Sequence, residues 1–91
     1  MLPYEYSNCI DGLDEIIKES WLIATKSEKT GNEKERLSSL DLIKNTYSTK
    51  MDLFTDTSLL KDSVKFVEDI KQKLEDSFIS HQEQHSLTTK F

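Results

Sequence analysis

Apolar residues recur along the chain at intervals of three and four positions, the spacing that places side chains on one face of an α-helix. Three runs of this kind are present, and short segments of turn-forming and capping residues separate them. The pattern predicts helices over about residues 8–28, 33–54 and 57–80.

The first run is preceded by residues suited to a helix start. Its apolar positions are Ile10, Leu13, Ile16, Ile17, Trp21, Ile23 and Ala24. Ser7 or Asn8 can cap the helix, because their side chains accept hydrogen bonds from backbone N–H groups of the first turn. Gly12 weakens that turn, which leaves a start at Asp11 as the alternative.

The second and third runs each follow a break in the pattern. Thr30, Gly31 and Asn32 suit a turn, and the four residues Thr55–Ser58 have short side chains that favour helix caps. The second run comprises Leu37, Leu40, Ile43, Tyr47, Met51 and Phe54. The third run comprises Leu59, Leu60, Val64, Phe66, Val67, Ile70, Leu74 and Phe78.

The width of the apolar faces decides how these helices assemble. At roughly 100° per residue, the apolar positions of the first and third helices each spread over an arc of about 160°. An arc this wide contacts two neighbouring helices, so we predict an all-α fold of three antiparallel helices, a three-helix bundle. Completion of the bundle by dimerisation or by a partner helix is the alternative.

This fold divides the chain into an N-terminal extension at residues 1–7, a domain at 8–80 and a polar C-terminal tail at 81–91. The tail either extends the third helix or frays. The side chains expected in the core are Ile17, Trp21, Leu40, Tyr47, Val67, Ile70 and Leu74.

A second apolar strip on the middle helix is the strongest candidate for a binding surface. Leu42 and Leu53 are eleven residues apart, which places them on the same side of a helix, about 140° from the expected core face. Thr46 and Thr49 between them leave the strip without charge, and charge depletion is typical of interface centres. Isolated exposed leucines are the simpler interpretation. Trp21 is expected in the core, with an exposed partner-binding anchor as its alternative.

Composition excludes several classes of partner. The chain has 91 residues and a net charge of −5, which disfavours binding to phosphate backbones or anionic membranes. Cys9, the one cysteine, has no partner for an internal disulfide, which favours a reducing compartment. The sequence shows neither a signal peptide nor a long apolar segment, so we expect a soluble protein of the cytoplasm or nucleus.

Catalytic chemistry finds little support in the sequence. His81 and His85 have the spacing of two metal ligands but lack a convincing third one, and the two glycines cannot build a phosphate-binding loop. Cys9 has no histidine near it in sequence that would activate a thiolate. The acidic residues Asp11, Asp14, Glu15 and Glu19 have the pattern of a hydrated helix surface. We therefore expect no catalytic, cofactor-binding or metal site.

These observations favour a non-enzymatic helical module for protein–protein interaction, an adaptor or a small subunit of a larger complex. Its expected partner is another protein or a second copy of the chain, bound at Leu42, Thr46, Thr49, Leu53 or Trp21. The alternative is a small acidic inhibitor or immunity protein that blocks a basic site on a target protein.

Overall fold

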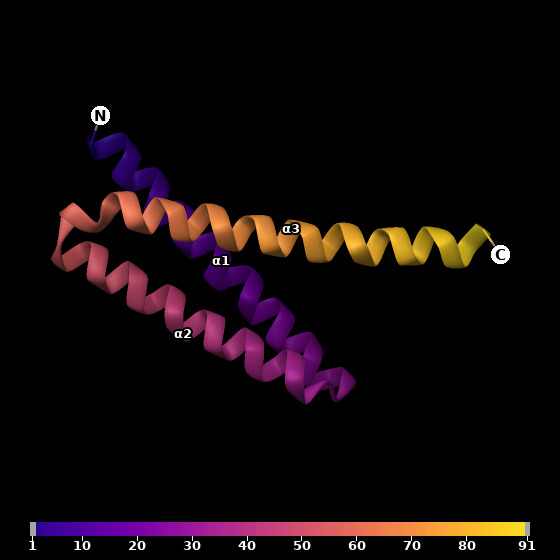
Figure 1. Cartoon of the computed structure of the whole chain (residues 1–91). Helices are drawn as coiled ribbons and strands as arrows, with labels where there is room; N and C mark the ends of the chain where they lie inside the picture. Colours follow the sequence, from indigo (N-terminus) through magenta and orange to yellow (C-terminus); the bar gives the residue numbers. More distant parts are fainter. Residues whose placement is uncertain (1, 91) are drawn as a thin grey trace.

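The computed structural model describes the backbone of residues 2–90 and the side chains of residues 3–76. The predicted all-α architecture is confirmed: three helices pack against one another, and the described backbone contains no strand (Figure 1). The elements are α1 (Leu2–Thr30), α2 (Glu33–Thr55), the short 3₁₀ helix η1 (Thr57–Leu59) and α3 (Leu60–Lys90).

Two of the helices extend beyond their predicted bounds. α1 begins at Leu2, within the expected N-terminal extension, and Pro3 lies in its first turn, where a helix requires no N–H donor. α3 continues to Lys90, through the segment expected to be a polar tail. Its first residue is Leu60 rather than Thr57, because residues 57–59 form the tighter 3₁₀ turn.

The connection between α1 and α2 forms where the sequence predicts it. Gly31 has a φ of 77°, a left-handed conformation that glycine adopts without steric cost. Asn32 caps α2, since its side-chain oxygen accepts a hydrogen bond of 3.1 Å from the backbone N–H of Glu35. These two residues end one helix and start the next, which makes α1 and α2 antiparallel neighbours.

A second cap connects α2 to α3. The Asp56 carboxylate accepts hydrogen bonds from the backbone N–H of Ser58 at 3.0 Å and from the Ser58 hydroxyl at 2.7 Å. Both bonds favour the charged form, so they lower the pKa of the Asp56 carboxyl. This turn directs α3 back across α1.

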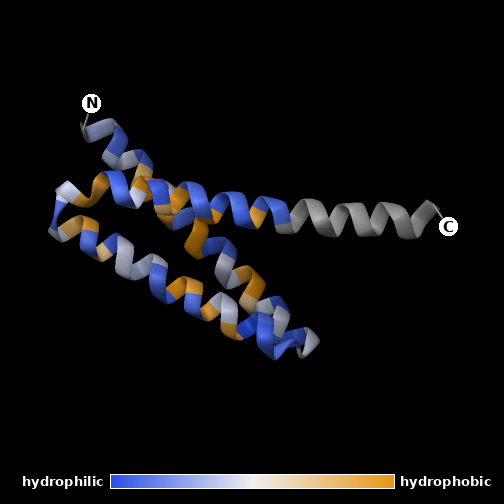
Figure 2. Cartoon of the chain, in the orientation of Figure 1, coloured by the Kyte–Doolittle hydropathy of each residue, from blue (hydrophilic) through white to orange (hydrophobic). Residues whose placement is uncertain are grey.

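The helices contact one another unequally. α1 and α2 form the most extensive contact, whereas α3 crosses α1 at an angle and contacts α2 only weakly (Figure 1). Apolar residues gather around this crossing, as the hydropathy colouring of the ribbon in Figure 2 shows. The core cluster comprises Cys9, Leu13, Ile16, Leu53, Leu60 and Val67.

Gly12 lies at the crossing of α1 and α3. A Cβ atom built on this residue would be 2.8 Å from Cγ1 of Val67, closer than carbon atoms approach in real structures. Glycine at this position therefore allows the two helices to pack more closely than any other residue would.

The predicted core is partly correct. One predicted residue on α1 and one on α3 are buried, but the two aromatic residues are not. Ile17 and Val67 are buried, whereas Trp21 and Tyr47 are about half exposed. The other three residues expected in the core, Leu40, Ile70 and Leu74, are partly buried.

The face that α2 buries is rotated by roughly 100° from the predicted one. Of the predicted apolar run α2 fully buries only Ile43, together with Ser39, Thr46 and Leu53. Thr46 is accommodated in the interior because its hydroxyl donates a hydrogen bond of 2.7 Å to the carbonyl oxygen of Leu42. With its polar atom satisfied, this small side chain lets α2 lie close to its neighbours.

Candidate interaction surfaces

The strip predicted to bind a partner lies inside the chain. Thr46 and Leu53 are 0% exposed, Leu42 packs against the core cluster, and Thr49 is partly buried. This corrects the predicted contact face: Thr46 and Leu53 are not accessible to another molecule, and Leu42 and Thr49 are only partly accessible. The low charge of the strip reflects burial within the chain.

Trp21, the fifth predicted residue, lies on the surface with 48% of its area exposed. Its position along the hairpin follows from the antiparallel register of α1 and α2. An ion pair marks this register: Asp14 Oδ1 and Lys50 Nζ are 2.6 Å apart. Trp21 lies seven residues after Asp14, and Ile43 lies seven residues before Lys50. Because the helices are antiparallel, Trp21 therefore lies level with Ile43. Since it is about two turns from Asp14, Trp21 lies on the same side of α1 as Asp14, the side from which that carboxylate contacts Lys50.

Five residues of the predicted apolar run of α2, together with Lys44, form a surface along the helix, which we call the outer stripe of α2. It comprises Leu37, Leu40, Lys44, Tyr47, Met51 and Phe54. Four of its apolar side chains, Leu37, Tyr47, Met51 and Phe54, are between 45% and 58% exposed. The steps between successive members are three, four, three, four and three residues, which is the heptad spacing of a helix that packs along another helix.

Lys44 lies within the outer stripe and Lys50 lies beside it. Lys50 is held by Asp14, and its Nζ lies 5.7 Å from the centroid of the Phe54 ring, close enough for a cation–π attraction. Lys44 Nζ lies 3.6 Å from Asp41 Oδ1, which keeps its charge near the surface of α2. Leu37, Tyr47, Met51 and Phe54, the exposed apolar side chains of the outer stripe, remain accessible beside these lysines.

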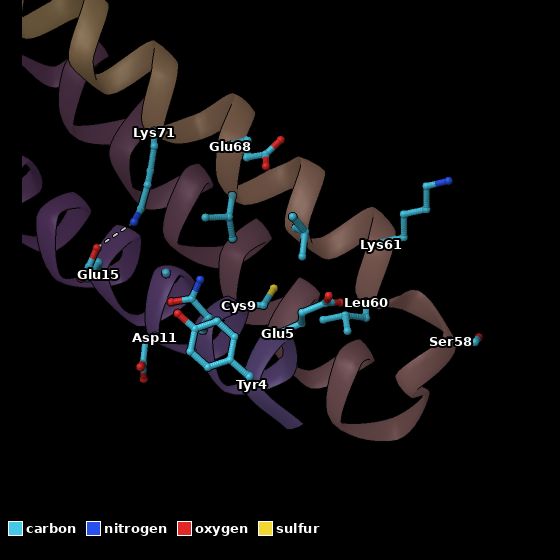
Figure 3. Close-up of a pocket in the computed structure, with 14 residues that line it drawn as sticks. Tyr4, Glu5, Cys9, Asp11, Glu15, Ser58, Leu60, Lys61, Glu68 and Lys71 are labelled. Carbon is cyan, nitrogen blue, oxygen red and sulfur yellow. Dashed lines mark hydrogen bonds and ion pairs between the residues drawn. The ribbon is translucent and has the colours of Figure 1, made fainter. Parts of the chain in front are cut away.

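A second surface is the groove between α1 and α3. It consists of two adjoining hollows of about 820 and 650 Å³, which share Glu15 and Lys71. Figure 3 shows Lys71 reaching from α3 to Glu15 on α1, and the two charged atoms are 2.8 Å apart. The apolar floor is formed by Cys9, Gly12, Ile16, Ile23, Leu60, Val64, Val67 and Leu74.

The rim of this α1–α3 groove is acidic. Its acidic residues are Glu5, Asp11, Glu15, Glu19, Glu35, Glu68 and Glu75, and its basic residues are Lys26, Lys61 and Lys71. Seven acids against three lysines give the groove a charge of −4, most of the −5 carried by the whole chain.

Ion pairing leaves most of this negative charge unpaired among the side chains of residues 3–76. Lys71 donates a hydrogen bond to Glu15 and, with its charge, lowers the pKa of that carboxyl. The six other acidic side chains of the rim have no ion-pair partner among these residues. Lys61 extends away from the other labelled side chains in Figure 3.

Cys9 and the possible metal ligands can be followed among the described side chains. Burial raises the pKa of the Cys9 thiol, which keeps it in the unreactive protonated form. Within residues 3–76 no three metal-binding side chains come together. The side chains of His81 and His85 lie outside the described residues. Among the described helices, none is long and apolar enough to cross a bilayer.

Comparison with protein families, curated proteins and solved structures finds no match to this chain. A candidate function therefore has to be argued from the outer stripe and the α1–α3 groove.

The two surfaces differ in how far the sequence reveals them. The sequence contains the outer stripe as a heptad-spaced run, but its apolar character led to its prediction as core. The groove has no sequence signal, because it depends on the angle at which α3 crosses α1.

Proposed function

We propose that this chain is a non-enzymatic protein-interaction module that packs the outer stripe of α2 against a helix of another polypeptide. The observation that carries the proposal is the half-exposed, heptad-spaced run along α2. A monomer gains nothing from four large apolar side chains in water, whereas a partner helix would bury them.

The free energy gained by burying these side chains can be compared with the free-energy cost of association. Fully burying a leucine, methionine or phenylalanine side chain contributes about 1.5–3 kcal/mol, so completing the burial of four half-exposed ones contributes roughly 3–6 kcal/mol. Association costs at least about 4 kcal/mol in lost translational and rotational freedom. The outer stripe alone therefore supports only weak binding, and adjacent apolar residues such as Trp21 have to contribute.

The test compares two double variants of equal charge. Leu37→Lys with Met51→Lys places two charges on the outer stripe, whereas Ser38→Lys with Asn45→Lys places two on other exposed positions of α2. Circular dichroism should show both variants folded, because none of the four residues is buried. Sedimentation equilibrium measures self-association, and quantitative pull-down from the native host measures capture of a partner.

We expect the stripe variant to lose at least about tenfold in affinity, a change of about 1.4 kcal/mol, and the control to remain within twofold or so of the parent. A parent protein that stays monomeric and captures no protein would contradict the proposal. Equal loss in both variants would show that charge, not the apolar stripe, determines binding.

The second candidate is an inhibitor that occupies a basic site on a target protein. The specific observation in its favour is the concentration of negative charge along the α1–α3 groove. Salt distinguishes the two candidates, since binding through the outer stripe should persist at high ionic strength while binding through the acidic rim should weaken.

A further inference from the structure

We infer that the α1–α3 groove binds a basic amphipathic helix of a partner protein. The inference rests on the proposed protein-binding function but concerns a different surface, so either one can fail alone. Three features of the groove define the occupant: its length, the arrangement of its apolar contacts and its charge.

The length of the groove matches a helix of about five turns. Tyr4 and Leu22, on the α1 wall, are 76% and 63% exposed and line opposite ends of the groove. They are eighteen residues apart, which is a whole number of helical turns, so they lie on the same side of α1 about 27 Å from each other. An occupant with apolar residues spaced to contact both would be about 18 residues long if helical.

The floor explains why the occupant should present an apolar side. Half-buried Leu74 and Ile23 lie in one hollow, and Leu60 and Val64 lie in the other. Each hollow has a volume within the range of protein ligand-binding pockets, about 300–1,000 Å³. A helix laid between two helices uses such hollows for alternate apolar side chains of one face.

Charge complementarity makes the occupant basic. Asp11 and Glu19 lie between Tyr4 and Leu22 along α1, while Glu68 and Glu75 line the groove from α3. Acidic residues therefore border the apolar floor on both sides. Lysines or arginines at the flanks of an apolar face would meet these carboxylates, whereas an acidic helix would be repelled.

The experiment uses a labelled synthetic helix of about 18 residues, with leucines on one face and lysines on its flanks. Two control peptides accompany it, one with glutamate in place of lysine and one with the same composition in a scrambled order. Binding to the full chain is measured by fluorescence anisotropy at about 0.15 M salt, where long-range attraction is largely screened.

Two pairs of protein variants localise the binding site. Glu19→Lys with Glu75→Lys reverses two charges on the groove, and Glu28→Lys with Asp52→Lys makes the same change in net charge at exposed positions outside it. Leu22→Ser removes an exposed apolar contact without changing charge. Circular dichroism establishes that each variant is folded before its affinity is measured.

We expect saturable binding of the leucine–lysine helix only. The groove pair should weaken it at least about tenfold, Leu22→Ser about fivefold, and the control pair less than about twofold. Equal loss in both charge-reversal pairs, or equal binding of the scrambled peptide, would overturn the inference, as would no binding at all. If only the Leu37→Lys and Met51→Lys variant lost affinity for the peptide, the peptide would bind at the outer stripe. That result would overturn the inference about the groove and leave the proposed function standing.

Discussion

Small residues with internally satisfied hydroxyl groups allow α1 to pack closely. Ser20 and Ser27 are almost fully buried, and each hydroxyl donates a 2.7 Å hydrogen bond to the carbonyl oxygen four residues earlier. Because that bond lies within α1, burying the serine leaves no polar atom without a partner. Ala24 and Gly12 add no bulk to the same region. The interior therefore depends on close backbone approach as much as on large apolar side chains.

Gly12 provides the sharpest test of this packing. Gly12→Ala should destabilise the fold by about 1 kcal/mol, because overpacking costs roughly 1–3 kcal/mol and alanine's helix propensity returns at most about 1 kcal/mol. The new methyl would meet Val67, whose branched side chain has few alternative rotamers in a helix. Urea unfolding of the purified variant measures the change.

The control for this prediction is the same substitution in a Val67→Ala background. There the methyl has room, so Gly12→Ala should stabilise the protein instead of destabilising it. A stabilising effect in the parent background would show that α1 and α3 are not in close contact at this crossing.

At the scale of the helix, periodicity predicts where the elements lie but not which way α2 faces. All three helices were predicted, α2 at nearly its observed bounds, whereas α1 starts six residues earlier and α3 ends ten residues later than expected. Both turns contain the expected residues Gly31 and Asp56. The face of α2 was assigned from its large apolar residues, which the structure leaves half exposed. No rule based on hydrophobicity favours burying Ser39 and Thr46 over Tyr47 and Phe54.

The groove could not be predicted for a related reason. Its shape follows from the angle between α1 and α3, and that angle depends on Gly12, which at the level of sequence indicates only a weakened helix turn. Asp11, Glu15 and Glu19 of its rim were interpreted as a hydrated helix surface, since only tertiary structure brings them beside the acidic residues of α3.

The Glu15–Lys71 ion pair should make the docking of α3 sensitive to acid. Lys71 holds the pKa of Glu15 below its ordinary value of 4.5, so the carboxylate stabilises the fold above about that pH. This contribution is lost as the pH falls through the lowered pKa of the folded state. The difference in unfolding free energy between the parent and Glu15→Gln should therefore shrink between about pH 5 and pH 3.

Unfolding titrations at several pH values measure this difference, and Lys71→Met should show the same convergence with the parent. Both carboxylate and ammonium are well exposed, so the effect is expected to be small at any pH. A difference that stays constant across this range would mean that Glu15 acts through something other than its charge.

At the scale of the whole molecule, the chain is an antiparallel hairpin of α1 and α2, and the described part of α3 packs against it less extensively than the two hairpin helices pack together. α1 and α2 share the most extensive contact, and an ion pair of 2.6 Å links them outside the core. α3 contacts the hairpin mainly through residues near its start, Leu60, Ser63 and Val67, which are buried. The α1–α3 groove results from this arrangement, because a third helix aligned with α1 would close it.

Unequal docking predicts two levels of protection against hydrogen exchange. Amides of α3 between Leu60 and Asp76 should exchange faster than those of α1 and α2, because separating α3 breaks fewer contacts than unfolding the hairpin. Val67→Ala should accelerate exchange in α3 and in the facing turn around Gly12, while the amides near Asp14 and Lys50 change little. Mass-spectrometric exchange on the intact chain measures all these segments together. Uniform acceleration of the three helices would show instead that the chain unfolds as a single unit, and the grooves beside α3 would then be as rigid as the core.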